Sequence, residues 1–266
     1  MVTSARANLR ITLLVLALAG LLAACGGKVD HNETEDSNLG HWGRALASVL
    51  TGRYEELSTG WFGGVEKNGR DRCSEILRED FGVEDREGLL REIRFALRSG
   101  AREDYHYDAD ALLLLAELPE EERETAMSAL SAQDRRRYEL VAYNVEQWGE
   151  LGLLGWDMAK VCLLAQLGYT AGYLTHAEAQ AVVEPAAAVI KSYFSDWQEL
   201  CRNVLDGEAL ILLLEPSSEE GGYAARALWL ETLIEAQDSK DMLFDEALFE
   251  QELDPLEELS YTALLV

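Results

Sequence analysis

The sequence has few of the residues from which metal sites and disulfide frameworks are built: four Cys and four His among 266 positions. No CxxC motif occurs, and no Cys/His pair has the spacing of a zinc site, which excludes structural zinc. A GxSxG elbow, a phosphate-binding loop, an HExxH motif and a dinucleotide fingerprint are also missing. The sequence therefore offers no recognisable catalytic set and implies no cofactor.

Basic residues are scarce as well: 23 Lys and Arg stand against 49 Asp and Glu, for a net charge of −26. Such a field repels the phosphates of nucleic acids and the headgroups of anionic lipids, so we expect neither as a partner. It favours a basic protein, a cationic peptide or a divalent ion. The same charge also maintains solubility without any ligand, and both interpretations stay open.

The first apolar run, residues 11–22, is too short for a comfortable bilayer span. Arg6 and Arg10 give it a basic start, and Leu22-Ala23-Ala24-Cys25 ends it with small residues before a cysteine. A charged start, a short apolar stretch and small residues are typical of an export signal. We therefore interpret residues 1–24 as a signal peptide.

The four residues that end this signal resemble the lipobox of bacterial lipoproteins. The resemblance implies that Cys25 is lipidated and that the mature chain is anchored in the cell envelope; the alternatives are a secretory signal cleaved near Ala24 and an uncleaved anchor helix. Residues 25–38 contain one aliphatic side chain, Val29, and are predicted to be a flexible tether. In a Gram-negative bacterium, Gly26 after the lipidated cysteine implies the periplasmic face of the outer membrane.

Three cysteines remain beyond Cys25: Cys73, Cys162 and Cys201. An odd number leaves at least one thiol without an intramolecular partner. Cys162 and Cys201 lie in apolar helical patterns, and an oxidising compartment could join them if their helices pack together. Buried free thiols are the alternative that we expect.

Apolar residues follow a helical period in nearly every segment after the tether, and strand signals are nearly absent, so we predict an all-α fold with an irregular multi-helix domain over residues 39–214. Capping boxes are predicted at Thr175 with Glu178 and at Ser195 with Gln198. Pro185 is expected to kink or divide the helix that follows the first of these boxes. One helix is predicted to begin after Asp85 and to end at Gly100, and two more are predicted over residues 134–148 and 156–167. A short apolar run at 112–118 precedes Pro119, which suits the first turn of another helix.

Residues 215–266 carry fourteen acidic residues against Arg226 and Lys240. We interpret them as an acidic C-terminal extension with a helix around 224–236. Trp229, Leu230, Leu233 and Ile234 favour docking of its first half onto the domain, and a loose acidic arm is the alternative.

Glycine and aromatic residues follow one another in a characteristic order between Gly155 and Trp197. Residues 155–160 read GWDMAK, residues 167–175 read LGYTAGYLT, and residues 194–197 read FSDW. This order resembles the core of domain-of-unknown-function family 1266, and the similarity extends over roughly residues 40–214. The resemblance implies a bacterial, mainly helical domain without an established activity.

Asp157 is the strongest candidate for a functional carboxylate in this stretch. In the first turn of a helix it would interact favourably with the helix dipole, and Lys160 could pair with it, which is a structural role. Alternatively, Asp157 with Lys160 is catalytic and lies in an aromatic-lined cleft. The candidate binding residues of that cleft are Trp156, Asp157, Tyr169, Tyr173 and Trp197. Gly168 and Gly172 are expected to end helices in the left-handed conformation.

A second candidate is the polar segment around His106. On an extended or turning segment, Asp104, His106 and Asp108 would project to one side and offer oxygen and imidazole ligands to a divalent ion. The alternative is an exposed polar loop that opens the next helix, with Asp108 or Asp110 as its cap.

Two hypotheses about function follow. The first is a membrane-tethered interaction module that binds a basic envelope protein or toxin. The second is a hydrolase-like enzyme that acts on an envelope component, with Asp157 as acid or base and a metal near His106. Charge and the missing catalytic motifs favour the first.

Overall fold

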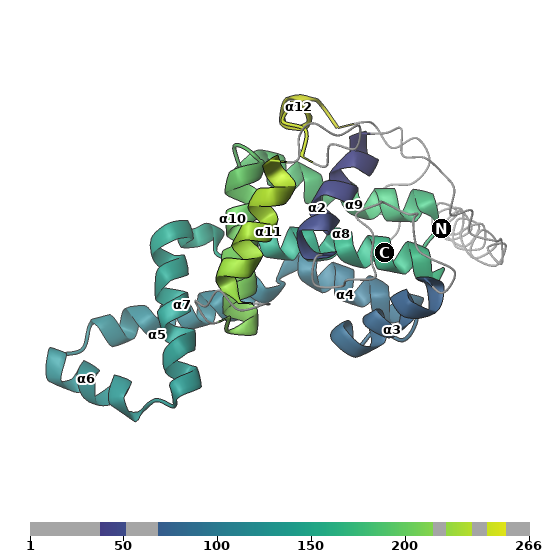
Figure 1. Ribbon diagram of the computed structural model, residues 1–266. Coiled ribbons are helices and arrows are strands. Elements are labelled where there is room, and N and C mark those ends of the chain that lie inside the picture. The colour runs from purple at the N-terminus through teal and green to yellow at the C-terminus, as the bar shows by residue number, and fades with distance from the viewer. Residues whose placement is uncertain (1–37, 52–68, 215–221, 236–243, 254–266) are drawn as a thin grey trace, which may run out of the picture.

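The computed structural model describes residues 38–51, 69–214, 222–235 and 244–253. The predicted signal peptide, Cys25 and nearly all of the predicted tether lie outside these ranges. The described part of the chain is helical and contains no strand, which confirms the all-α fold (Figure 1). Its elements are α2 (Asn38–Thr51), α3 (Gly69–Phe81), α4 (Arg86–Arg98), α5 (Ala101–Ala116), α6 (Glu120–Ala129), α7 (Ala132–Trp148), the 3-10 turn η1 (Gly149–Leu151), α8 (Leu154–Ala171), α9 (His176–Tyr193), α10 (Trp197–Leu212), α11 (Tyr223–Glu235) and α12 (Ala247–Glu250).

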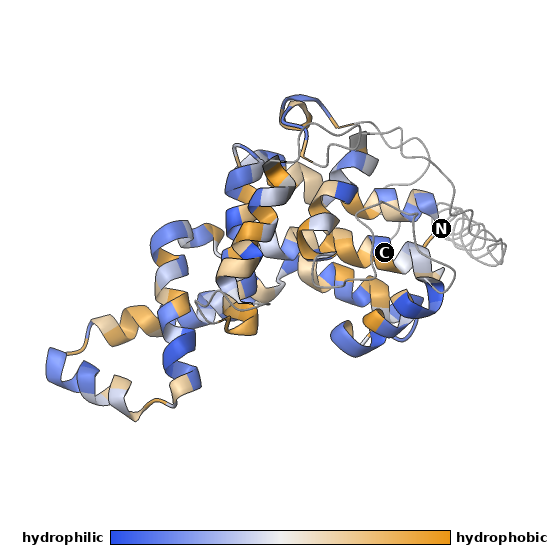
Figure 2. Cartoon of the chain, viewed as in Figure 1, coloured by the Kyte–Doolittle hydropathy of each residue, from blue (hydrophilic) through white to orange (hydrophobic). Residues whose placement is uncertain are grey.

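Helix α8 lies at the centre, with α2, α3, α4, α9 and α10 packed around it. Nearly every one of its residues is buried, and Figure 2 shows the apolar character of most of its length. A helix that is apolar all round must be covered on all sides, which explains its position. Among the described residues, no single helix has the length and apolarity to cross a membrane. Residues 132–151 and helix α8 together have the required length and composition, but the chain bends by 79° between them.

Local capping signals place several helix starts correctly. The Asp85 side chain accepts a hydrogen bond from the Gly88 N–H at the start of α4. Thr175 and Glu178 form the predicted capping box of α9. At α10 the prediction is wrong by one residue, because the capping side chain is Asp196, which accepts from the Glu199 N–H at 2.8 Å.

Of the two effects expected of Pro185, a kink or a division, the division does not occur, because the helix runs from His176 to Tyr193 with the proline inside it. Helix α9 packs against both α8 and α2. Its apolar face, which includes Val182, Val183 and Ile190, is fully buried. Tertiary packing of this kind stabilises the helix enough to tolerate the backbone hydrogen bond that a proline removes.

Of the two glycines expected to be left-handed, only Gly172 is, with a φ of 83° at the end of α8. Gly168 is helical, and a Cβ there would lie 2.2 Å from Cδ2 of Leu89 on α4. Its function is therefore to let α4 approach α8 closely, and the expectation of a helix end at this residue is wrong.

The first half of the acidic extension is docked. Helix α11 packs on α10, and Leu230 is buried between them. Arg226 of α11 donates from Nε to Glu208 of α10 at 3.0 Å and from Nη2 to the Val49 carbonyl of α2 at 3.0 Å. Its guanidinium also lies 4.5 Å from the ring centroid of Trp229. One arginine therefore links α11 to its neighbour α10 and to α2, which lies far from both in the sequence.

Helices α5, α6 and α7 form an arm that leads away from the body and returns to it (Figure 1). Helix α5 packs against α7 near the base of the arm, and α6, at the far end, has no buried residue. The predicted apolar run at 112–118 forms the second half of α5 and the turn after it.

Candidate functional site

Asp157 is fully buried in the first turn of α8. Its carboxylate accepts hydrogen bonds from the backbone N–H groups of Ala101, at 2.8 Å, and Arg102, at 3.3 Å. The Arg102 Nη1 atom also lies 2.9 Å from Oδ2. These N–H groups open α5, whose own cap position is Gly100 and supplies no side chain. Asp157 therefore caps a different helix from a distance of 56 residues in sequence.

Burial raises the pKa of Asp157 to about 6, and Arg102 with the two N–H donors act in the opposite direction. A carboxyl group with such a pKa suits proton transfer, but here it lies in the core with both oxygens engaged. The expected ion pair with Lys160 does not form, because Lys160 Nζ lies 2.7 Å from Glu92 Oε1 instead. These contacts give Asp157 a structural role that differs from the expected one, because its partners are the start of α5 and Arg102 rather than Lys160.

None of the other candidate binding residues is exposed. Trp156, Tyr169 and Trp197 are buried, and Tyr173 is half-buried and donates from its hydroxyl to a backbone carbonyl of the loop before α4. Tyr169 lies twelve residues from Asp157 on one helix, which separates them by about 18 Å. Trp197 belongs to an aromatic cluster with Trp42, Phe244 and Phe249. These aromatic residues form parts of the core at separate places.

The expected extended or looped segment around His106 is helical, because α5 already begins at Ala101. Successive residues turn by about 100° in a helix, so His106 points away from the side shared by Asp104 and Asp108. Asp108 instead pairs with Arg137 of α7, with Nε 2.6 Å from Oδ2. No group of three potential metal-binding side chains lies together anywhere in the described ranges.

The three cysteines beyond Cys25 are buried and are not joined to one another. Burial raises the pKa of Cys73 to about 11 and that of Cys201 to about 12, and it raises the pKa of Cys162 as well. Thiols of this kind behave as small apolar side chains rather than as nucleophiles.

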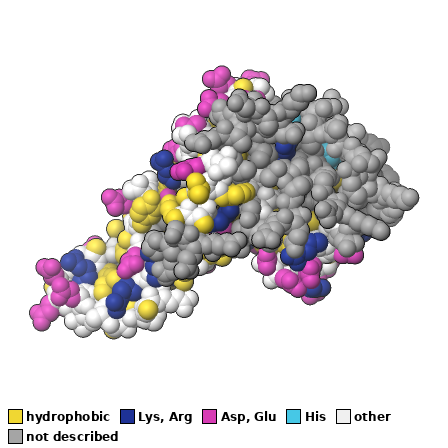
Figure 3. Space-filling model, in the orientation of Figure 1, with side chains coloured by type: hydrophobic (Ala, Val, Ile, Leu, Met, Phe, Trp, Pro, Cys, Tyr) yellow, Lys and Arg dark blue, Asp and Glu magenta, His cyan; other side chains and the backbone are white. Residues whose placement is uncertain are grey.

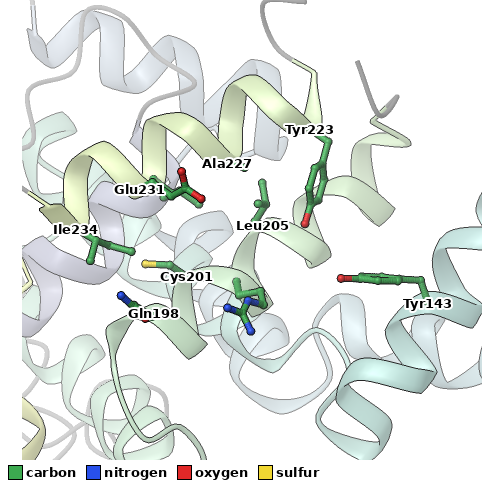
Figure 4. Close-up of a pocket in the computed structure, with 10 residues that line it drawn as sticks. Tyr143, Gln198, Cys201, Leu205, Tyr223, Ala227, Glu231 and Ile234 are labelled. Carbon is green, nitrogen blue, oxygen red and sulfur yellow. The ribbon is translucent and has the colours of Figure 1, made fainter. Parts of the chain in front are cut away.

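A pocket of about 510 Å³ lies between α7, α10 and α11 (Figure 4). Apolar side chains from α10 and α11 form one part of its lining, and Arg202 and Glu231 contribute opposite charges. The phenol rings of Tyr143 and Tyr223 point toward it from α7 and from the start of α11. The lining residues are Tyr143, Gln198, Cys201, Arg202, Leu205, Tyr223, Ala227, Leu230, Glu231 and Ile234.

A buried carboxylate, Asp206, holds the Tyr223 side chain in place at this pocket. It accepts hydrogen bonds from the Tyr223 hydroxyl at 2.8 Å and from the Trp148 Nε1–H at 2.9 Å. Burial raises the pKa of both Asp206 and Tyr223. Sequence reasoning missed Asp206, although an acid within an apolar helical pattern is the signal that could have indicated a buried polar contact.

The arm carries large apolar side chains that are exposed among the residues that the structure describes. Tyr107 is 76 % exposed, Leu113 58 %, Leu114 67 % and Leu118 37 %. Asp110 and Glu117 lie between them on the same side and are exposed. Contiguous exposed apolar groups rimmed by polar ones mark interaction sites. We call this set the arm surface; it comprises Tyr107, Asp110, Leu113, Leu114, Glu117 and Leu118.

Several carboxylates lie close to the arm surface along the chain. The first turn of α6 adds Glu120, Glu121 and Glu122, all exposed. Figure 3 shows acidic side chains at the far end of the arm, with hydrophobic and some basic side chains beside them. Between residues 103 and 124 the sequence contains nine acidic residues and a single basic one, Arg123. Helix α7, which packs against α5, adds Arg135, Arg136 and Arg137, and Arg137 pairs with Asp108. Residues 101–148 contain twelve acidic and five basic residues, so the arm has a net negative charge beside its apolar row.

Comparison with known proteins gives one match. A family model described as "Protein of unknown function (DUF1266)" matches residues 76–240. The match begins inside α3 and covers the chain from α4 through α11, so it includes the docked helix of the acidic extension. No curated protein and no solved structure matches the chain.

Proposed function

Because the chain belongs to the DUF1266 family of proteins of unknown function, no activity follows from its family, and we propose that it is a lipid-anchored interaction module of the bacterial cell envelope that binds a basic partner protein. The observation that carries this proposal is the arm surface, an exposed row of leucines among carboxylates on a projecting part of the fold.

The anchor is supported by the sequence alone. A basic start, a short apolar run and Leu22-Ala23-Ala24-Cys25 together have the form of a lipoprotein signal. Several acyl chains on Cys25 would hold the protein at the membrane essentially permanently, since each buried methylene contributes about 0.8 kcal/mol. A short polar tether would then keep the helical body, and the arm with it, close to that membrane.

The interaction role is supported by where the apolar and acidic side chains lie. Burial of apolar surface is the dominant favourable term in most protein–protein association, and complementary charges favour the right partner and speed its approach. The arm surface has both components. An enzyme that uses Asp157 has less support, because the carboxylate is engaged in capping α5.

The anchor is tested by replacing Cys25 with Ser in a bacterium that processes lipoproteins. We expect the native chain to incorporate labelled palmitate and to remain in the membrane fraction, while the Cys25→Ser chain incorporates none. Cys73→Ser is the matched control, since Cys73 is buried within the fold. Unchanged labelling of Cys25→Ser would contradict the proposed anchor.

The partner is tested by affinity capture of the full chain from envelope membranes at low and high salt. We expect a basic protein to be recovered at low ionic strength and lost at high ionic strength, because exposed charges are screened. Neutralising Glu120, Glu121 and Glu122 to Gln should reduce the recovery. The control neutralises three exposed acids of the body, Glu79, Glu84 and Glu87, and should not. Equal recovery at low and high salt, and equal recovery by the native chain and both variants, would contradict the proposal.

A further inference from the structure

Resting on the proposed function, we infer that the partner of the arm surface is a basic amphipathic helix, which lays its apolar face along Leu114 and its neighbours while its Lys and Arg side chains reach the flanking carboxylates.

The shape of the arm surface fits a helix. Tyr107, Leu114 and Leu118 recur at spacings of seven and four residues, which places them on one stripe of α5 and the turn that follows it. From Tyr107 to Leu118 this stripe is about 16 Å long, which is roughly three turns of an α-helix. A partner helix that lies along such a stripe offers side chains at positions i, i+3, i+4 and i+7.

The packing of α5 itself does not require these side chains to be apolar. Its opposite face is the one that packs: Tyr105 is buried, with its hydroxyl on the Gly149 carbonyl at 2.9 Å, and Ala109 and Leu112 pack against the core. An exposed helix face is normally polar, so the packing of the described helices does not account for leucines at 113 and 114. Their exposure leaves them accessible to a second molecule.

Charge selects the occupant. A second copy of this chain would bring another acidic arm against the first, and the chain as a whole carries a net charge of −26. The chain's own residues 254–266 are unsuitable as well, since they contain Asp254, Glu257 and Glu258 and no basic residue. Anionic lipid headgroups are repelled for the same reason. A helix with Lys or Arg beside its apolar stripe satisfies both the leucines and the carboxylates.

The test measures binding of synthetic helical peptides to the mature chain with Cys25→Ser, by fluorescence anisotropy. The probe is a Leu/Lys peptide whose leucines follow helical spacing; the comparison peptides are the same composition in scrambled order and a Leu/Glu peptide with the same pattern. We expect the patterned Leu/Lys peptide to bind at least tenfold more tightly than either. Equal binding of the scrambled peptide, or binding of the Leu/Glu peptide, would overturn the inference.

Matched variants locate the site. Leu114→Asp should weaken binding of the Leu/Lys peptide at least tenfold, whereas Leu228→Asp, at a leucine on α11 that is 65 % exposed, should change it less than twofold. Both variants should keep the far-UV circular dichroism and melting temperature of the parent chain. Equal effects of the two variants would overturn the inference, as would a dimer of the parent chain that Leu114→Asp dissociates.

The inference and the proposed function fail differently. If a basic envelope protein is captured in a salt-sensitive way but Leu114→Asp does not reduce its capture, the helix inference falls and the function stands. If the patterned peptide binds at the arm surface but the envelope yields no basic partner, the surface stands and the proposed function falls.

Discussion

The structural role of Asp157 can be tested by two substitutions that remove different parts of its contacts. Asp157→Ala removes the acceptor for the N–H groups of Ala101 and Arg102, and it leaves the Arg102 guanidinium, whose side chain is 14 % exposed, without its carboxylate. Breaking a buried ion pair from one side costs about 3–5 kcal/mol of folding free energy. Asp157→Asn keeps the shape and one oxygen, and it removes only the charge.

The pH dependence gives a second and sharper signature. The pKa of Asp157 is about 6 in the folded chain, above the value of 3.8 for an unperturbed carboxyl, because burial outweighs the attraction of Arg102. Between these values the folded chain holds a proton that the unfolded chain has released. The contribution of Asp157 to stability is therefore greatest below this window and falls as the pH rises through it, by about 1.4 kcal/mol per pH unit and roughly 3 kcal/mol in all.

The assay is urea unfolding of the parent chain, Asp157→Asn and Asp157→Ala at several pH values from 4 to 7.5, followed by circular dichroism. Subtracting the Asn variant from the parent removes the contributions of all other titrating groups that the two chains share. We expect this difference to shift against the parent as the pH rises from 4 to 6 and to be constant above pH 7. A difference that shifts in favour of the parent would show that Arg102 dominates, and an Ala variant as stable as the parent would refute the capping role.

Two further predictions concern the backbone and the docked helix. Gly100→Ala should lower the free energy of unfolding by about 2 kcal/mol more than Gly82→Ala. Both glycines have a positive φ, but only at Gly100 would a Cβ meet the Asp157 carboxylate that caps α5, at 2.3 Å. Thermal unfolding of the two variants checks this, and equal losses of stability would contradict it. Arg226→Ala should remove the buried contact with Glu208 and the hydrogen bond to the Val49 carbonyl, and weaken the docking of α11 by about 3–5 kcal/mol, seen as faster hydrogen exchange of the α11 amides. Arg91→Ala, which removes an exposed pair, should have an effect below about 1 kcal/mol on the same measurement, and similar exchange in the two variants would contradict the role of Arg226.

Local sequence signals predicted much of the helical framework. Asp85 and Thr175 begin helices as expected, because each cap lies within three residues of the N–H group that it accepts. The start of α5 was missed for the opposite reason, since its cap is Asp157 on α8. Without that distant acceptor, the polar residues around His106 resemble a loop. Helix α3 has no counterpart among the predicted helices.

The candidate site was less accessible to sequence reasoning. The run of leucines at 112–115 indicates a helix, but it does not show that Leu112 packs inward while Leu113 and Leu114 face solvent. The pocket of Figure 4 joins side chains from α7, α10 and α11, and nothing in their spacing indicates that they meet. In both cases the deciding information is which face of a helix its neighbours cover.

The most direct test of the proposed function is site-specific photo-crosslinking in the living bacterium, with the reactive residue placed at position 114 or, as control, at position 228. Both leucines are similarly exposed, at 67 % and 65 %, but only Leu114 belongs to the arm surface. The account predicts that position 114 gives a membrane-associated adduct with a basic protein, which a high-salt wash before irradiation prevents, and that position 228 gives none. No adduct at position 114, or the same adduct at both positions, would contradict it.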